Sequence, residues 1–223
     1  MGASVIGVVS GRGGAGASTL AAALAGQLAR RTSTVLVDLD RGSGGIEVLL
    51  GVEGCDGVRW PDLSGARGDV PGAEVVALLP RWGPCAVLSA DRFRGGPPEP
   101  AVVADVLHGL CAAVGAVVLD LDRGSVVAGE SLVAVCDAVV VVAPRDLVSA
   151  AGVLAMRPFL GGPSVGLVVR GPAILGAAEL AQAVDLPLLG TFRTDRGLSS
   201  ARAGVPVRGR TARFAARLVR GLP

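Results

Sequence analysis

Apolar runs and helical segments alternate along the whole chain. The runs that we predict to be strands are rich in valine and leucine: 4–9, 34–39, 85–89, 116–121, 138–143, 164–169 and 187–191. Between them, helices are predicted near 18–31, 71–79, 100–114, 125–135, 145–158, 175–184 and 208–220. Nearly continuous apolar runs are typical of strands that are covered on both faces. The pattern therefore predicts an α/β fold, a doubly wound and mostly parallel sheet with helices on both faces.

Two stretches rich in glycine and proline interrupt this alternation, at 54–72 and 94–100. Regular alternation resumes after each, so we expect excursions within one domain that spans 1–223. No uninterrupted apolar stretch reaches the roughly 20 residues that a membrane span needs.

Composition narrows the function classes. The chain is 51% hydrophobic and 18% charged, which suits a globular domain, and its formal charge of +2 gives no reason to predict a specific nucleic-acid partner. All 21 basic residues are arginine, and lysine, asparagine and tyrosine are absent. His108 is the single histidine, which excludes a multi-histidine metal site and leaves no obvious Ser-His-Asp triad. The four cysteines have no C-x-x-C spacing.

A glycine-rich turn joins the first predicted strand to the first predicted helix. Residues 11–18 read G-R-G-G-A-G-A-S and fit the phosphate-loop pattern G-x-x-x-x-G-K-[ST], except that Ala17 stands where the lysine belongs. A bias toward arginine would convert a needed lysine to arginine, as at Arg12. Alanine at position 17 therefore indicates that the demand for a cation has lapsed there.

The same turn also fits the dinucleotide fingerprint G-x-G-x-x-G, with Asp38 at the distance of a ribose-binding carboxylate. Ser18 and Thr19 at the helix start, and Asp120 at the end of the run 116–121, favour a phosphate loop with Mg²⁺ instead. A plain tight turn, and acidic residues that merely end strands, remain the structural alternatives.

Longer segments match the motifs of one known family in the correct order. They are R-G-G-A-G-A-S-T at 12–19, V-L-V-D-L-D at 35–40 with a glycine-rich turn and the helix I-E-V-L-L-G after it, Asp120, D-A-V-V-V-V-A-P-R-D-L-V-S-A at 137–150, and V-D-L-P-L-L-G-T-F-R-T-D followed by A-R-A-G-V-P-V near the end. With these segments the chain resembles the ParA/MinD family of deviant Walker A ATPases. The loop and R-W-P-D-L at 59–63 look most like the actinobacterial septum-site-determining, CpaE/TadZ-like members. Many of those carry an N-terminal receiver-like domain, which we expect to be absent or removed here.

The resemblance implies roles for individual residues. Asp40 would orient the attacking water with Asp38 beside it, Ser18 and Asp120 would hold Mg²⁺, and Arg12 would reach the partner's phosphates across a homodimer. Arg170 falls near the adenine-reading position, and Arg193 and Asp195 would contact base or ribose. The remaining implied contacts to ATP or ADP come from the loop: Gly11, Gly13, Gly14, Ala15, Gly16, Ala17, Ser18 and Thr19.

The function that this implies is an ATPase-like localisation or scaffold protein for Tad-type pilus or secretion assembly, or for septum-site positioning, with weak or no ATP hydrolysis. An active ATP-dependent dimerisation switch that uses Arg12 is the first alternative, and a Rossmann enzyme is the least favoured. We expect a cytoplasmic protein that is recruited to the pole, the septum or the inner membrane face.

The segment 208–220 adds one surface hypothesis. Arg210, Arg213, Arg217 and Arg220 share one helical face, and Phe214 and Leu218 lie on the other. This pattern predicts either peripheral membrane contact or, as we prefer, a final helix that packs on the sheet with an arginine-rich solvent face.

Overall fold

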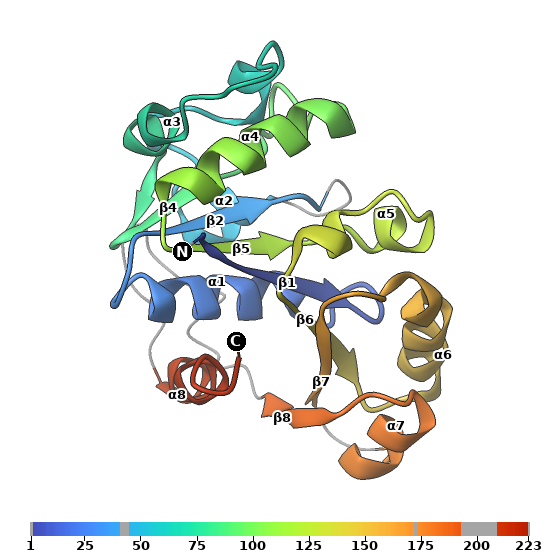
Figure 1. Cartoon of the computed structure of the whole chain (residues 1–223). Helices are drawn as coiled ribbons and strands as arrows, with labels where there is room; N and C mark the ends of the chain where they lie inside the picture. The colour runs from blue at the N-terminus through green and yellow to red at the C-terminus, as the bar shows by residue number, and fades with distance from the viewer. Residues whose placement is uncertain (1, 41–44, 172–173, 193–208, 223) are drawn as a thin grey trace.

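The architecture of the chain was established from a computed structural model, which describes residues 2–40, 45–171, 174–192 and 209–222. They form an eight-stranded sheet in the order β3-β4-β2-β5-β1-β6-β7-β8 (Figure 1), and β3 alone is antiparallel to its neighbour. The strands are β1 Ser4–Ser10, β2 Thr34–Asp38, β3 Arg81–Trp82, β4 Cys85–Leu88, β5 Ala116–Asp120, β6 Ala138–Pro144, β7 Ser164–Arg170 and β8 Leu188–Phe192. Every predicted strand is confirmed, and the short β3 is an addition. The doubly wound, mostly parallel α/β fold is thus confirmed.

The helices follow the predicted segments with one exception. They are α1 Ala17–Leu28, α2 Ile46–Leu50, α3 Gly72–Leu78, α4 Pro100–Ala113, α5 Arg123–Val127, α6 Leu147–Met156, α7 Ala177–Ala183 and α8 Gly209–Leu218, with 3₁₀ turns η1 Trp60–Leu63, η2 Leu132–Val135 and η3 Arg157–Phe159. The prediction of one helix over 125–135 is wrong. Gly129 adopts φ +74°, which ends the helical course, and Ser131 then caps η2 separately.

Two apolar layers cover the two faces of the sheet. Val5, Val37 and Val117 face the layer that contains α3, α4 and α6, while Ile6, Leu36 and Val118 face α1, α2 and α8. Successive strand residues point to opposite faces, so the continuous valine and leucine runs fill both layers. Figure 1 shows α4 and α1 on either side of the central strands.

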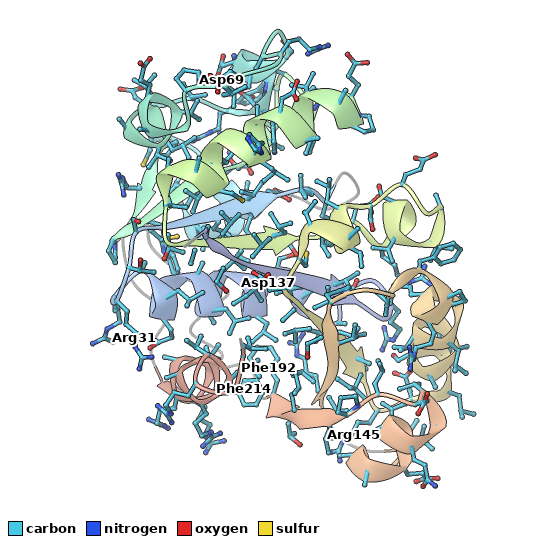
Figure 2. All side chains as sticks on the ribbon, viewed as in Figure 1. Arg31, Asp69, Asp137, Arg145, Phe192 and Phe214 are labelled. Atoms are coloured by element: carbon cyan, nitrogen blue, oxygen red, sulfur yellow. The ribbon has the colours of Figure 1, made fainter. Side chains whose placement is uncertain are left out.

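The apolar face of α8 is buried within the fold. Phe214 points toward Phe192 of β8 (Figure 2), with ring centroids 5.8 Å apart, and α8 also packs against α1. The four arginines of the opposite face are exposed: Arg210, Arg213, Arg217 and Arg220. The preferred prediction, a final helix that packs on the sheet with an arginine-rich solvent face, is therefore confirmed. Of the two faces of α8, only the arginine face remains accessible to a membrane surface. Among the described residues, no helix combines the length and the apolar character of a membrane span.

We expect Phe214→Ala to destabilise the protein by about 3–5 kcal/mol, because the buried ring fills the space between α8 and β8. The free energy of unfolding in urea measures this change. Arg213→Ala, on the exposed face of the same helix, is the matched control and should change stability by less than about 0.5 kcal/mol. Equal effects of the two substitutions would contradict the packing of α8.

Candidate functional site

The strands of the central sheet bring several predicted residues to one edge. Asp38, Asp120 and Arg170 are the last residues of the parallel strands β2, β5 and β7, and the glycine-rich turn follows β1 at the same edge. β1 pairs with β5 and β6, not with β2. In the dinucleotide-binding fold, the first two strands are neighbours. The strand order therefore favours the phosphate loop over the dinucleotide fingerprint.

The glycine turn leaves the start of α1 without a side-chain cap. Gly14 and Gly16 have φ +72° and +95°, which a side chain would strain, and Gly16 is the N-cap residue of α1. Within the described part of the chain, the backbone N–H groups of Gly13, Gly14 and residues 16–19 donate to no protein group. Such unpaired N–H groups, at the positive end of a helix dipole, favour an anion.

Contacts beneath the turn hold it in place. A side chain at Gly152 of α6 would overlap the carbonyl oxygen of Gly11, and one at Gly11 would lie 2.9 Å from Val153. Arg123, the first residue of α5, donates from Nε to the carbonyl of Gly11 at 3.0 Å. Sequence reasoning missed Arg123, because nothing in its local pattern connects it to a turn more than 100 positions away.

The turn forms one wall of a hollow of about 480 Å³. Ala17 lies in this wall and is almost fully buried, with no charged group of its own to offer. The lining residues come from β1, α1, α2 and the ends of β2, β5 and β7: Ser10, Gly13, Gly14, Ala15, Gly16, Ala17, Ser18, Thr19, Asp40, Gly45, Val48, Leu49, Asp120, Leu121 and Arg170.

Two buried carboxylates lie side by side at the base of the site. Asp38 and Asp120 are register partners on β2 and β5, and each is only 1% exposed. Burial raises the pKa of Asp38 to about 7, although the N–H groups of Ile46 and Asp40 donate to it at 2.9 and 3.1 Å. Burial, followed by the charge of Asp38, also raises the pKa of Asp120 well above its ordinary value.

Asp120 has the surroundings of a cation ligand. The Ser18 side chain lowers the pKa of the Asp120 carboxyl group, against the larger effect of burial, while the Oδ2 atom of Asp120 has no hydrogen-bond partner in the described structure. The described residues contain no cluster of three or more His, Cys, Asp or Glu side chains suited to a metal. The oxygen donors of Ser18 and Asp120 fit Mg²⁺, which usually binds through one or two protein ligands together with phosphates and water.

Trp60 supports the end of β2, where Asp38 is the last residue and Asp40 follows two positions later. This side chain is fully buried in η1, and its Nε1 donates to the carbonyl oxygen of Asp38 at 2.7 Å. The glycine- and proline-rich stretch 54–72, which the sequence pattern marks only as an interruption, therefore positions the acidic end of β2 through Trp60.

Arg12 points from the turn toward α6 of its own subunit. Its Nε donates to Ser149 Oγ at 3.0 Å, and its Nη2 forms an ion pair with Asp146 Oδ2 at 3.0 Å. The N–H of Ser149 lowers the pKa of Asp146, and the Arg12 guanidinium lowers it further. Sequence reasoning placed Arg12 on the loop but missed Asp146 and Ser149 as its partners.

The structure thus brings most of the predicted site residues together. The residues from Gly13 to Thr19 line the hollow with Asp40, Asp120 and Arg170, while Asp38 lies beneath and Gly11 supports the turn. Arg12 faces α6. Arg193 and Asp195 lie outside the described residues.

We expect Asp120→Asn to stabilise the metal-free protein near neutral pH by about 1–3 kcal/mol. The folded state raises the pKa of Asp120, so it holds the proton more tightly than the unfolded chain, and stability is lost as pH rises above the ordinary value of 3.8. Asparagine abolishes this loss, so its advantage should nearly vanish near pH 4. Urea unfolding with a chelator across this pH range measures the difference. The exposed Asp69→Asn is the control, and a pH-independent effect of Asp120→Asn would contradict the buried-carboxylate account.

Comparison with known protein sequences finds relatives at two degrees of sequence identity, 39% and 28%. A scan against protein-family models finds no match. The chain is 39% identical over 204 residues to the uncharacterized protein Rv3660c of Mycobacterium tuberculosis, covering 88% of the chain but only 56% of that relative. It is 28% identical over 221 residues to the uncharacterized ATP-binding protein MJ0547 of Methanocaldococcus jannaschii, covering 92% of the chain and 80% of the relative.

Solved structures share the fold of the chain. A ParA family ATPase from Chlorobium tepidum superposes with a TM-score of 0.77 at 16% identity, covering 97% of both chains. The septum site-determining protein MinD from Pyrococcus horikoshii, complexed with Mg-ADP, gives a TM-score of 0.76 at 18% identity, covering 98% of this chain and 95% of that one. The chain therefore has the fold of the ParA/MinD P-loop NTPases.

Proposed function

We propose that this chain is an ATPase-like localisation or scaffold domain, with a degenerate Walker A loop that binds Mg-ATP or ADP weakly and hydrolyses ATP slowly or not at all. The observation that carries the proposal is the loop itself. Its N–H groups and glycine conformations are those of a phosphate cradle, yet Ala17 supplies no cation. We take 1–223 as one domain, and the machinery served as Tad-type pilus or secretion assembly, or septum-site positioning.

Names of relatives support a nucleotide ligand. MJ0547 is described as an ATP-binding protein, and the MinD neighbour was solved with Mg-ADP. The chain's own contribution is the fit of its donors, namely amides for phosphates and the oxygens of Ser18 and Asp120 for Mg²⁺. The kinship to CpaE/TadZ-like proteins rests on the loop sequence and on the R-W-P-D-L segment, whose Trp60 supports the end of β2.

The proposed chemistry separates binding from turnover. Mg²⁺, when bound, neutralises phosphate charge, while the loop amides hold the phosphates and Asp40, at the rim of the hollow, orients a water molecule. Phosphoryl transfer also requires neutralisation of the charge that develops in the transition state. A lysine contact of this kind contributes roughly 1.5–3 kcal/mol, so its loss at position 17 weakens affinity about 10- to 100-fold.

We therefore expect Ala17→Lys to bind Mg-ATP about 10- to 100-fold more tightly than the wild type in isothermal titration calorimetry. The reason is the added ammonium group in the wall of the hollow beside the loop amides. Gln182→Lys adds the same charge on exposed α7 and should leave affinity unchanged. No difference between Ala17→Lys and wild type would contradict the assignment of position 17 as a missing phosphate contact.

Phosphate release from ATP should be very slow or undetectable for the purified wild type, and Asp40→Ala should lower any residual rate to background. A robust wild-type rate that Asp40→Ala abolishes would overturn the scaffold assignment in favour of an active ATPase. A rate that survives Asp40→Ala would indicate a contaminating enzyme.

The second candidate is an ATP-dependent dimerisation switch, and the position of Arg12 favours it. The ion pair with Asp146 holds this arginine against α6 of its own subunit, and its side chain is still 44% exposed. Leu147 and Val148, directly after Asp146, are each 70% exposed, and such apolar side chains are typical of an interface. A homodimer formed through this edge would cover them and place Arg12 near the partner's loop.

Asp146→Asn should release Arg12 and increase the dimer fraction in Mg-ATP, measured by analytical ultracentrifugation. Leu147→Asp should reduce that fraction, because a charge would enter the apolar contact. Leu78→Asp is the control, since Leu78 is similarly exposed on α3, away from the site. A dimer that responds equally to Leu147→Asp and Leu78→Asp would place the interface elsewhere.

Localisation belongs to the same proposal. We propose a cytoplasmic protein whose protein partners recruit it to the pole, the septum or the inner membrane face, with the exposed arginines of α8 available for peripheral contact with acidic lipid. No specific nucleic-acid partner is proposed.

A further inference from the structure

Arg170 enters the hollow from the end of β7. Its Nη1 donates to the carbonyl oxygens of Ala15 at 2.9 Å and Gly14 at 3.3 Å, so the guanidinium lies against the glycine turn. A side chain at Gly16 would collide with it. The guanidinium also lies above the ring of Phe192, 5.9 Å from its centroid, which restricts where the side chain can go. The turn and β8 therefore hold this cation in place.

The charge of Arg170 has no acidic partner in the described structure. Ion pairs are formed by Arg12, Arg67, Arg94 and Arg157, whereas Arg170 donates only to carbonyl oxygens, through one of its nitrogens. It is half-buried, and burial lowers the pKa of the guanidinium. A cation that is partly withdrawn from water without a counter-charge is costly unless an anion completes the site.

The other formal charges of the hollow have the opposite sign. Asp40 and Asp120 line it, Asp38 lies beneath, and Arg170 is the one cation among the described lining residues. The loop amides contribute only partial charges. The carboxyl groups therefore offer a polyphosphate no attraction, and Arg170, together with any bound Mg²⁺, is the source of positive formal charge among the described lining residues.

We propose that Arg170 is the phosphate-binding cation of this site and takes over the role that position 17 has lost. The ligand class is a polyphosphate ester, bound by the loop amides on one side and by the free guanidinium nitrogens of Arg170 on the other. This inference rests on the proposed nucleotide-binding function, and it assigns the charge recognition of that site to β7 instead of α1.

The test compares Arg170→Gln with wild type in calorimetric titrations with Mg-ATP, adenosine and inorganic tripolyphosphate. Glutamine keeps an amide donor for the carbonyl oxygens of the turn but removes the charge. Affinity for Mg-ATP and for tripolyphosphate should fall about 10- to 100-fold, and weak binding of adenosine should not change. Arg157→Ala, which removes an arginine that pairs with Asp185 at the other end of β8, should change neither affinity.

A double variant separates charge from structure. Ala17→Lys combined with Arg170→Gln should recover most of the affinity that Arg170→Gln loses, because the lysine ammonium at the start of α1 supplies a cation to the same hollow. A merely structural Arg170 would not be rescued by a lysine at position 17, and the inference would then be wrong. Thermal unfolding of each variant without ligand confirms that the comparison is between folded proteins.

The outcomes distinguish this inference from the proposed function. Tight Mg-ATP binding that Arg170→Gln leaves unchanged would contradict the inference and leave the function standing. Absence of Mg-ATP binding, with tripolyphosphate raising the melting temperature of wild type but not of Arg170→Gln, would contradict the function and support the inference. No response to either ligand would contradict both.

Discussion

The close approach of α6 to the glycine turn is the constraint on which the site depends. Gly11 and Gly152 face each other with no room for a side chain, and Arg123 ties the Gly11 carbonyl to α5. With the turn anchored at this point, Gly14 and Gly16 can take positive φ values and α1 can begin without a capping side chain. The N–H groups at the start of α1 then remain available to a ligand. The conformation of the glycine turn therefore depends on these backbone contacts and not on the side chain at position 17, where alanine replaces the lysine of the phosphate-loop pattern.

Most of the charged groups around the hollow come from strand ends and not from the glycine turn. Asp38 and Asp120 are buried together. Desolvation raises the pKa of both carboxyl groups, and the charge of Asp38 raises the pKa of Asp120 further. Two buried carboxylates are costly when both are charged, and a bound cation or a proton relieves this cost. The two arginines of the site occupy different positions: Arg12 is held by Asp146 on α6, and Arg170 lies on the turn without an acidic partner. The protein therefore holds one cation away from the hollow and one inside it.

Local patterns predicted the fold and the loop but not the contacts that join distant elements. Valine and leucine runs were sufficient for every predicted strand, since strands covered on both faces need nothing else. The predicted helix 125–135 is divided at Gly129. The sequence does contain a local signal for this division, a glycine followed two residues later by a capping serine, and this signal outweighs the apolar periodicity. Two contacts connect residues that are far apart in the sequence: the ion pair between Arg12 and Asp146, and the hydrogen bond from Trp60 to the carbonyl oxygen of Asp38. Only the packing of α6 and η1 on the sheet creates these contacts.

Amide exchange in the loop tests the central claim most directly. In a ¹⁵N-labelled sample titrated with Mg-ADP, the account predicts shifted resonances and slowed hydrogen exchange for Gly13, Gly14 and Gly16, because their N–H groups become donors to phosphate. Residues that line the second pocket beside α4, such as Val103 and Leu132, should not change. Unchanged loop amides at saturating ligand, or changes confined to that second pocket, would contradict the assignment of the glycine turn as a phosphate cradle.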